Sequence, residues 1–255
     1  MTGGHHSPTR ATAAPDWAQG LRVVVTGAAG TLGRAIVEEA VLQGATVVAT
    51  GRDPSLSAAS LPAAARRVVA DLSRPEECHH LIEQAHAELG GIDVVVNNAA
   101  VLTHRRIIDL EPGDLEQSWA VNVRAPVLLK QAAIPSLAES PSPVVINVVS
   151  GAGITGGVAP VSAYAMSKAA LIVFTKAAAR EFGPLGIRVV AVSPPTLESQ
   201  MQAALDDESR AAVRSMNVLG RPFEATEVAR LVLFVASPHA SVMTGSTIDA
   251  TGAML

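Results

Sequence analysis

The chain has 255 residues, of which 49% are hydrophobic but only 3% aromatic, and it contains one cysteine and one tyrosine. Its 19 Lys and Arg against 23 Asp and Glu give a net charge of −4 without a basic cluster, so no nucleic-acid partner is expected. The lone cysteine, Cys78, excludes an internal disulfide framework and is typical of a reducing compartment, which predicts a cytoplasmic protein.

The two ends of the domain and its lack of a membrane segment are predicted from composition. Residues 1–19 are rich in Thr, Ala, Pro and Gly and lack the apolar core of a secretory signal, so we predict a disordered tail. The longest uncharged stretch, Ser140–Ser167, is interrupted by prolines and glycines, so no membrane association is expected. Residues 20–255 are predicted to form one domain, because no linker or repeat divides them.

Short apolar runs alternate along the domain with longer amphipathic stretches. The predicted strands are 21–26, 45–50, 67–70, 92–96, 144–149, 187–192 and 246–250. The predicted helices are 32–43, 76–89, 114–137, 163–182 and 225–236. This alternation predicts an α/β fold, a doubly wound parallel sheet (Rossmann fold) of about seven strands with helices on both faces. Ligands of such sheets bind beyond the carboxyl ends of the strands.

The first strand ends in a glycine-rich turn, Thr26-Gly27-Ala28-Ala29-Gly30-Thr31-Leu32-Gly33, which leads into a helix. Gly27 would allow the tight turn, Gly30 a close approach to a pyrophosphate, and Gly33 close packing of helix against strand. The helix N-terminus would offer N–H groups to the anion. The turn therefore predicts a dinucleotide site, although a plain strand-to-helix turn is the alternative.

The end of the second strand bears on which dinucleotide binds. A carboxylate there would bind the ribose 2′-OH of NAD and repel the 2′-phosphate of NADP. This chain has Gly51 at that position and Arg52 beside it, and a guanidinium suits a phosphate. NADP(H) is therefore favoured and NAD(H) remains possible, because Arg52 could be a solvated turn residue. Arg34 is a weaker candidate, since Glu38 could pair with it.

Tyr164 and Lys168 lie four residues apart in a helical pattern and therefore on one face. A nearby ammonium would lower the pKa of the phenol, which is near 10 in water. The pair could protonate a carbonyl oxygen as hydride arrives, or take the proton from an alcohol in reverse. The alternative is a half-buried ring beside a solvated lysine.

The order of the motifs resembles the short-chain dehydrogenase/reductase family, in its compact single-domain branch, over nearly the whole chain after residue 20. The resemblance is carried by the glycine turn, Asp71-Leu72, Asn97-Asn98-Ala99, Asn122, Ser150, Tyr-Ala-Met-Ser-Lys at 164–168 and Pro194. The chain departs from the family pattern at Thr31, Ala100 and Pro195, where the family usually has glycine.

The resemblance implies a role for each of these residues. Tyr164 would be the general acid/base, and Lys168 would lower its pKa and hold the nicotinamide ribose. Ser150 would hydrogen-bond the substrate oxygen, and Asn122 would anchor a water that relays protons from Lys168. The implied cofactor contacts are Gly27, Gly30, Thr31, Leu32, Gly33, Arg52, Asp71, Leu72, Asn98, Ala99, Tyr164, Lys168 and Pro194.

We predict an NADP(H)-dependent oxidoreductase that interconverts a ketone and a secondary alcohol. The alternatives are an NAD-dependent alcohol dehydrogenase of the same family and a catalytically silent nucleotide-binding regulatory protein. The substrate is expected to be a small aliphatic or alicyclic compound, because apolar residues recur between Leu197 and Leu219, where the family has its lid. The resemblance also implies a homotetramer or homodimer that pairs through helices 114–137 and 163–182.

Two polar clusters are less specific. Cys78-His79-His80 with His86 has metal-ligating residue types but no second ligand pair, so a surface helix is favoured and no metal is expected. His104-Arg105-Arg106 follows the fourth strand and could attract an anionic substrate, although a solvated loop is the stronger interpretation.

Overall fold

The computed structural model describes residues 16–52, 61–157, 160–197, 207–208, 211, 218–219 and 221–253. Seven parallel strands form one sheet in the order β3-β2-β1-β4-β5-β6-β7. The strands are β1 (Arg22–Thr26), β2 (Thr46–Gly51), β3 (Arg66–Val69), β4 (Val94–Asn97), β5 (Val144–Val148), β6 (Arg188–Ser193) and β7 (Thr247–Asp249). The predicted doubly wound sheet is therefore confirmed, with its switch point where β1 lies between β2 and β4.

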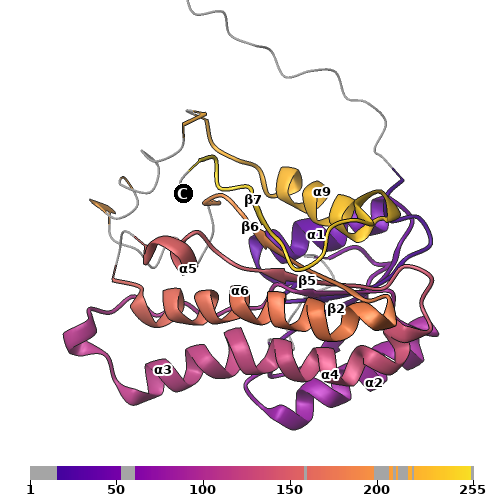
Figure 1. Cartoon of the computed structure of the whole chain (residues 1–255), viewed down its shortest axis with the longest axis horizontal. Coiled ribbons are helices and arrows are strands. Elements are labelled where there is room, and N and C mark those ends of the chain that lie inside the picture. The colour runs from indigo at the N-terminus through magenta and orange to yellow at the C-terminus, as the bar shows by residue number, and fades with distance from the viewer. Residues whose placement is uncertain are drawn as a thin grey trace, which may run out of the picture.

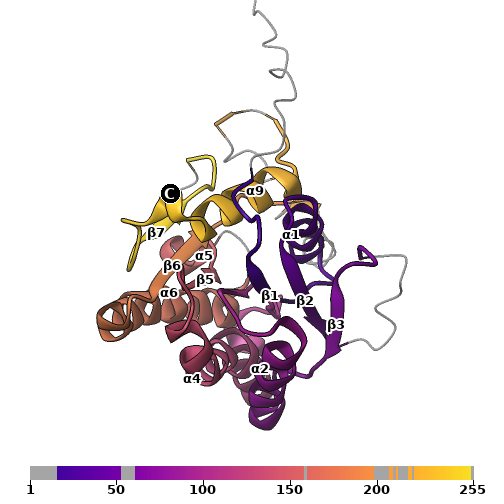
Figure 2. The same cartoon turned by 90° about the vertical axis from the view of Figure 1, so that its right-hand side faces the viewer.

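Helices cover both faces of this sheet (Figures 1 and 2). The α-helices are α1 (Thr31–Leu42), α2 (Pro75–Leu89), α3 (Pro112–Trp119), α4 (Ala125–Ala138), α5 (Ala152–Thr155), α6 (Ser162–Phe182) and α9 (Ala225–Ala236). Helices α1 and α9 pack on one face, and α2, α4 and α6 lie on the other (Figure 2). Within the described residues, no helix is both long and apolar enough to span a membrane.

The two faces have separate apolar cores because side chains alternate along each strand. In β1, Val23 and Val25 belong to the core under α1 and α9, whereas Val24 belongs to the core under α2 and α4. All four residues of β4 and all five of β5 are buried. Strands covered on both sides favour Val and Ile, since β-branched side chains pack well on a pleated surface.

The predicted helix 114–137 is interrupted in the structure. Helix α3 ends at Trp119, the π-helical segment η2 (Ala120–Arg124) follows, and α4 begins at Ala125. A π-helical turn holds one extra residue, and such turns are frequent at functional sites. Asn122 lies in the middle of η2 and is fully buried.

Residues 16–19 differ from the predicted disordered tail. They form a turn in which the N–H of Gln19 donates to the carbonyl of Asp16 at 3.2 Å. The ring of Trp17 lies edge-on to Phe234 of α9, with the centroids 5.4 Å apart, and Ala18 is fully buried. A tryptophan that packs on a helix buries enough apolar area to order a short segment that is otherwise rich in small residues.

Candidate active site

The glycine turn between β1 and α1 is shaped by close backbone contacts. Gly27 has a φ of 65°, and a Cβ at this position would lie 2.7 Å from the Cα of Ala99. A Cβ at Gly33 would collide with the carbonyl oxygen of Gly27 and lie 2.7 Å from the amide nitrogen of Asn98. Both glycines are therefore required by the fold itself. At Gly30 a Cβ would meet only Gly27 O, at 3.4 Å, among the described residues, so packing does not require a glycine there.

Asn98 and Thr26 hold this turn in place. The Asn98 side-chain amide donates to the carbonyls of Thr26 at 2.9 Å and Gly27 at 3.2 Å. The Thr26 hydroxyl accepts from the backbone N–H groups of Asn98 and Ala99, each at 3.0 Å. The connections that follow the neighbouring strands β1 and β4 are thus joined by hydrogen bonds at the switch point of the sheet, where such folds bind their ligands.

The turn fits the diphosphate of a dinucleotide. Gly30 is the N-cap of α1 and offers no side-chain acceptor to the first turn of the helix. The amide dipoles at this end therefore point to open space, which favours an anion. Thr31 and Leu32 open the helix and are half-buried beside the glycines. Gly30, exposed and not needed for packing, lets the backbone approach such a ligand closely.

Arg52 and Asp71 lie at the carboxyl ends of the neighbouring strands β2 and β3. Asp71 accepts hydrogen bonds from the hydroxyl of Ser73 at 2.8 Å and its N–H at 3.0 Å, and these bonds hold the pKa of Asp71 below its usual value. The charge of the exposed Arg52 acts in the same direction. Arg34 is 3.8 Å from Glu38, the pairing expected for it.

Leu72, a predicted cofactor contact, turns its side chain away from the cofactor edge of the sheet. Its side chain is buried in the core under α2 and α4, and its carbonyl accepts a hydrogen bond from Cys78. Only the backbone of Leu72 is available to a ligand. Cys78 is buried as well, and burial raises the pKa of its thiol to about 11, which makes this cysteine unreactive. Helix α2, predicted to be a surface helix, thus points Cys78 into the core.

Ser150, Tyr164 and Lys168 come together beyond the end of β5. Ser150 follows β5, while Tyr164 and Lys168 lie one turn apart on α6. The Lys168 ammonium donates to the carbonyl of Val148 at 2.7 Å and lies 5.6 Å from the centroid of the Tyr164 ring. Ser150 lies near enough to the phenol to lower its pKa. Tyr164 is 8% exposed and Lys168 1% exposed, so solvent reaches the phenol only narrowly.

Asn122 is tied to the same group through Ser167. Its side-chain oxygen accepts from the N–H of Val101 at 2.8 Å, and its amide donates to the carbonyl of Val101 at 2.9 Å and to the Ser167 hydroxyl at 2.9 Å. The Ser167 hydroxyl in turn donates to the carbonyl of Tyr164 at 2.7 Å. Asn122 thus braces the start of α6 against the connection that follows β4.

The pKa of Tyr164 shifts in the direction opposite to the expected one. Burial raises it to about 12, against a smaller lowering by the hydrogen bond with Ser150. Burial also lowers the pKa of Lys168 to about 8. The ammonium is directed at the carbonyl of Val148, so desolvation of the phenol outweighs the expected influence of the lysine. At neutral pH the phenol is protonated and most Lys168 is charged.

Buried lysines make the stability of this chain depend on pH. Lys130 of α4 is 2% exposed, with its ammonium 3.7 Å from the Phe174 ring centroid and 4.7 Å from that of Phe182, and burial lowers its pKa to about 8 as well. Lysine in an unfolded chain has a pKa of about 10.4, so above pH 8 the unfolded state binds more protons than the native one. We expect the free energy of unfolding to rise from about pH 8 to about pH 9.

Above that window the rise should weaken, because the raised pKa of Cys78 acts with the opposite sign from about pH 9. The measurement is the urea midpoint at pH 7, 8 and 9 for the wild type and Lys130→Met. The variant should show roughly half of the rise, since only Lys168 continues to contribute. A wild-type midpoint that falls over this range, or an unchanged slope in the variant, would contradict the assignment.

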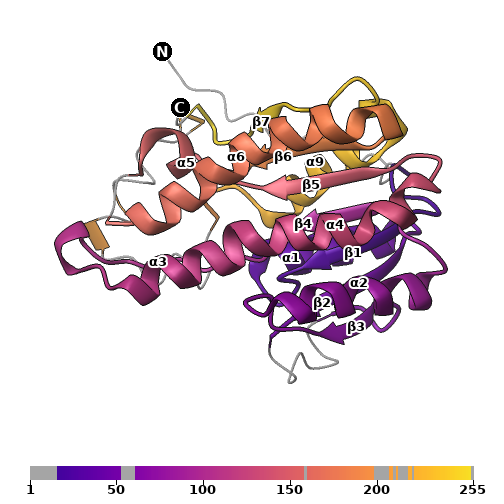
Figure 3. The same ribbon diagram turned by 60° about the horizontal axis from the view of Figure 1, so that its bottom comes forward.

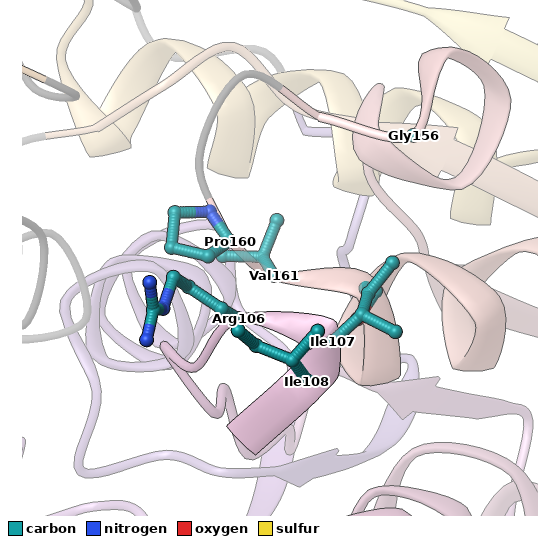
Figure 4. Close-up of a pocket in the computed structure, with 7 residues that line it drawn as sticks. Arg106, Ile107, Ile108, Gly156, Pro160 and Val161 are labelled. Carbon is teal, nitrogen blue, oxygen red and sulfur yellow. The ribbon is translucent and has the colours of Figure 1, made fainter. Parts of the chain in front are cut away.

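A pocket of about 430 Å³ opens between the segments that follow β4 and β5 (Figure 4). It is mainly apolar and is lined by Arg106, Ile107, Ile108, Gly156, Pro160, Val161 and Ser162. Val161 lines the pocket and also packs in one apolar cluster with Tyr164, which links the pocket to the active-site helix. Ile107 and Ile108 are 74% and 82% exposed at its edge.

The basic segment after β4 is more ordered than a solvated loop. Arg105 pairs with Glu111 at 2.8 Å and Asp114 at 2.9 Å, and its N–H donates to the carbonyl of Pro160 at 2.8 Å. Arg106 lines the pocket and pairs with Asp109 at 2.6 Å. Both charges thus have acidic partners, which weakens the case for capture of an anionic substrate.

The remaining predicted positions vary in how far the structure describes them. Pro194 is half-buried directly after β6, on the same edge of the sheet as Ser150. The predicted lid, 197–219, lies mostly outside the described residues. Sequence reasoning missed Thr26 and Ser167, whose roles depend on partners distant in sequence, and no local pattern marks them.

A glycine cradle at the switch point, a buried Tyr–Lys pair with Ser150 beyond β5 and an apolar pocket lined by Val161 define a dinucleotide-dependent oxidoreductase of the Rossmann type. A family model described as enoyl-(acyl carrier protein) reductase matches residues 27–253. The chain belongs to the short-chain dehydrogenase/reductase family, which confirms the predicted family and enzyme class, an oxidoreductase acting on carbonyl or CH–OH groups.

Curated relatives and solved structures cover almost the whole chain. The chain is 32% identical over 243 residues to a 3-oxoacyl-[acyl-carrier-protein] reductase of Aquifex aeolicus, covering 92% of this chain and 98% of the relative. It is similar to a short-chain dehydrogenase of Burkholderia cenocepacia in complex with NADP (30% identity, TM-score 0.85, 92% and 98% coverage). It is also similar to a 3-ketoacyl-(acyl-carrier-protein) reductase of Brucella melitensis complexed with NADH (27% identity, TM-score 0.86, 93% and 99% coverage).

Proposed function

We propose that the chain is an NADP(H)-dependent ketoreductase that reduces the 3-oxo group of acyl thioesters to the secondary alcohol. The observation that carries this proposal is the buried phenol of Tyr164, with Ser150 near it and Lys168 one helical turn away. A ketone needs a proton donor at its oxygen when hydride reaches its carbon, and a neutral phenol can supply it. The relatives named as 3-oxoacyl-[acyl-carrier-protein] reductases support the substrate class.

Each residue has a distinct task in this proposal. When bound, NADPH supplies the hydride. Ser150 donates a hydrogen bond to the ketone oxygen and polarises it, while Tyr164 donates its proton to that oxygen as negative charge develops there. Lys168, charged at neutral pH, stabilises the phenolate left on Tyr164 and contacts the nicotinamide ribose. Asn122, with its buried hydrogen bonds to Val101 and Ser167, keeps Tyr164 in place and is the expected anchor of a proton-relaying water.

The cofactor is held at the edge formed by β1, β2 and β3. Gly27, Gly30 and Gly33 with the N-terminus of α1 hold the diphosphate, and Arg52 pairs with the 2′-phosphate of NADP(H). Beyond them, Asp71 contacts the adenine. The solved relatives with bound NADP and NADH support a nicotinamide cofactor, and Arg52 favours the phosphorylated one.

Arg52→Asp should therefore reverse the cofactor preference. The variant replaces a favourable ion pair by a repulsion at the 2′-phosphate, so the ratio of kcat/KM for NADPH to that for NADH should fall by about 100-fold. The matched control is Arg34→Asp, since Arg34 already pairs with Glu38, and its effect on the ratio should stay within about threefold. An unchanged ratio in Arg52→Asp would assign the preference to other residues.

The apolar pocket next to Val161 supports an aliphatic substrate. Its edge is formed by Ile107 and Ile108, and Pro160 and Val161 contribute further aliphatic surface. No aromatic side chain lines it, so a saturated chain fits its described surface better than a flat ring that would stack. The acyl chain or the thioester arm of the substrate would occupy this space while its 3-oxo group faces Tyr164 and Ser150.

We further propose that the protein is cytoplasmic.

We also propose that the subunits pair through α3, α4 and α6, which lie side by side on one face of the molecule (Figure 3). Leu115 and Trp119 form an exposed apolar stripe on α3, as Met166 and Val173 do on α6, with exposures of 42% to 66%. Exposed apolar area of this kind marks an interface. Light scattering should therefore give a homodimer or homotetramer, and Trp119→Glu combined with Val173→Glu should lower the mass. A monomeric wild type at micromolar concentration would contradict this proposal.

A further inference from the structure

Three buried polar side chains form a hydrogen-bonded chain beneath the active site. Asn97 ends β4, Asn147 lies in β5 and Thr175 lies on α6, and their exposures are 2%, 0% and 0%. The Asn97 amide donates to the side-chain oxygen of Asn147 at 2.8 Å, and the Asn147 amide donates to the Thr175 hydroxyl at 2.9 Å. That hydroxyl donates to the carbonyl of Leu171 on the same helix at 2.8 Å.

The donor and acceptor directions along the Asn97–Asn147–Thr175 hydrogen-bond chain are fixed by its end on α6. The carbonyl of Leu171 can only accept, so the Thr175 hydroxyl gives its proton to it and must accept from Asn147. The oxygen of Asn147 is then turned towards Asn97, its partner in the β4–β5 register. A buried amide is costly to desolvate, and this arrangement recovers that cost only when α6 sits at one height against β5.

Apolar packing alone fixes the position of α6 along β5 only weakly. The buried apolar residues of α6 near Thr175 are Leu171, Ala178 and Ala179, with Phe174 packed against these clusters, and apolar contacts are non-directional. Hydrogen bonds, in contrast, weaken steeply away from their preferred distance and angle. The Asn97–Asn147–Thr175 hydrogen bonds therefore supply the directional contact between α6, which carries Tyr164 and Lys168, and the central strands β4 and β5.

Residues close in sequence to Asn97, Asn147 and Thr175 make the contacts that hold the active site. Val148, whose carbonyl accepts from the Lys168 ammonium at 2.7 Å, follows Asn147. Lys168 lies seven residues before Thr175, two helical turns along the same face of α6. Asn98, which fastens the glycine turn, follows Asn97.

We propose that Asn147 and Thr175 are positioning residues, which fix α6 in register against β5 and thereby set Lys168 on the Val148 carbonyl and Tyr164 in its buried place. This inference rests on the proposed function for its catalytic meaning. Its geometric part, the placement of the phenol, can be measured without turnover, because Tyr164 is the only tyrosine of the chain.

The test compares Thr175→Val, which keeps the shape but removes the hydroxyl, with Thr175→Ser, which keeps the hydroxyl. Thr175→Val should loosen the phenol from its buried place, and the fraction of phenolate at pH 10, read by ultraviolet absorbance, should rise about tenfold. Its kcat for a 3-oxoacyl thioester should fall about tenfold with little change in KM for NADPH. Thr175→Ser should restore both values to within about twofold of the wild type.

The matched control is Ser136→Ala, which removes a buried hydrogen bond from the N–H of Ile92 at the other end of the sheet. It should lower the urea midpoint as Thr175→Val does but leave the phenolate fraction and kcat unchanged. If Thr175→Val behaves like this control, the Asn147–Thr175 hydrogen bond has only a structural role and the inference is wrong. If the wild type reduces no ketone, the proposed function fails, while the phenolate comparison still decides the positioning role.

Discussion

Replacing Tyr164 by Phe is expected to lower kcat for ketone reduction by about 10²- to 10⁴-fold, the usual contribution of a positioned proton donor. The variant keeps the ring that packs against Val161 and the neighbouring apolar residues, so the fold should persist. It removes only the hydroxyl that Ser150 contacts. The measurement is NADPH oxidation against a panel of 3-oxoacyl thioesters and simple ketones at pH 7.

Two further readouts separate lost chemistry from lost structure. Binding of NADPH, followed by cofactor fluorescence, should change by less than about threefold, because the substitution removes one hydroxyl and leaves the glycine turn and Arg52 intact. The urea midpoint should also stay close to the wild-type value. Equal turnover in wild type and variant would refute Tyr164 as the proton donor, whereas loss of both binding and stability would show that the substitution disturbed the fold.

Replacing Gly33 by Ala is expected to abolish tight binding of the cofactor. A methyl group at this position would collide with the carbonyl of Gly27 and press on the amide of Asn98, so the turn that we propose holds the diphosphate must move. We expect Kd for NADPH to rise at least about tenfold and the free energy of unfolding to fall by about 2 kcal/mol, as for other overpacked sites. Isothermal titration calorimetry and urea unfolding provide the two values.

Two other glycines provide matched controls for this substitution. Gly113 of α3 has nothing within 4 Å of an added Cβ among the described residues, so Gly113→Ala should leave stability and binding unchanged or slightly improve stability. Gly30→Ala meets only an ordinary contact inside the protein. It should keep the fold and weaken NADPH binding, because its methyl would face the ligand. Normal binding by Gly33→Ala would remove the glycine turn from the cofactor site.

The sheet and the outline of the site could be predicted because each rests on local patterns. Apolar runs separated by amphipathic stretches identify a parallel sheet, and the glycine turn and the Tyr164–Lys168 spacing each lie within a few residues of sequence. The carboxyl ends of the strands then gather these motifs at one edge, as β1, β5 and β6 do here.

What could not be predicted depends on contacts between distant segments. Asn147 lies in an apolar run that identifies a strand, but its partner Thr175 is 28 residues further along the chain. Leu72 matches a family motif, although its side chain turns to the core. The pKa of Tyr164 follows the depth of burial, which a four-residue spacing does not encode.

The π-helical segment between α3 and α4 has a consequence for the lengths that this region can tolerate. A π-helical turn holds one residue more than an α-helical turn, so deleting one residue from Ala120–Arg124 would leave a regular α-helix there, with α3 and α4 in nearly unchanged phase. Asn122 would then be displaced from Val101 and Ser167, whereas Lys130 would stay beside the rings of Phe174 and Phe182. A single deletion in this segment should therefore remove the contacts of Asn122 while the packing of the flanking helices persists, so the extra residue of the π-helical turn serves to place Asn122.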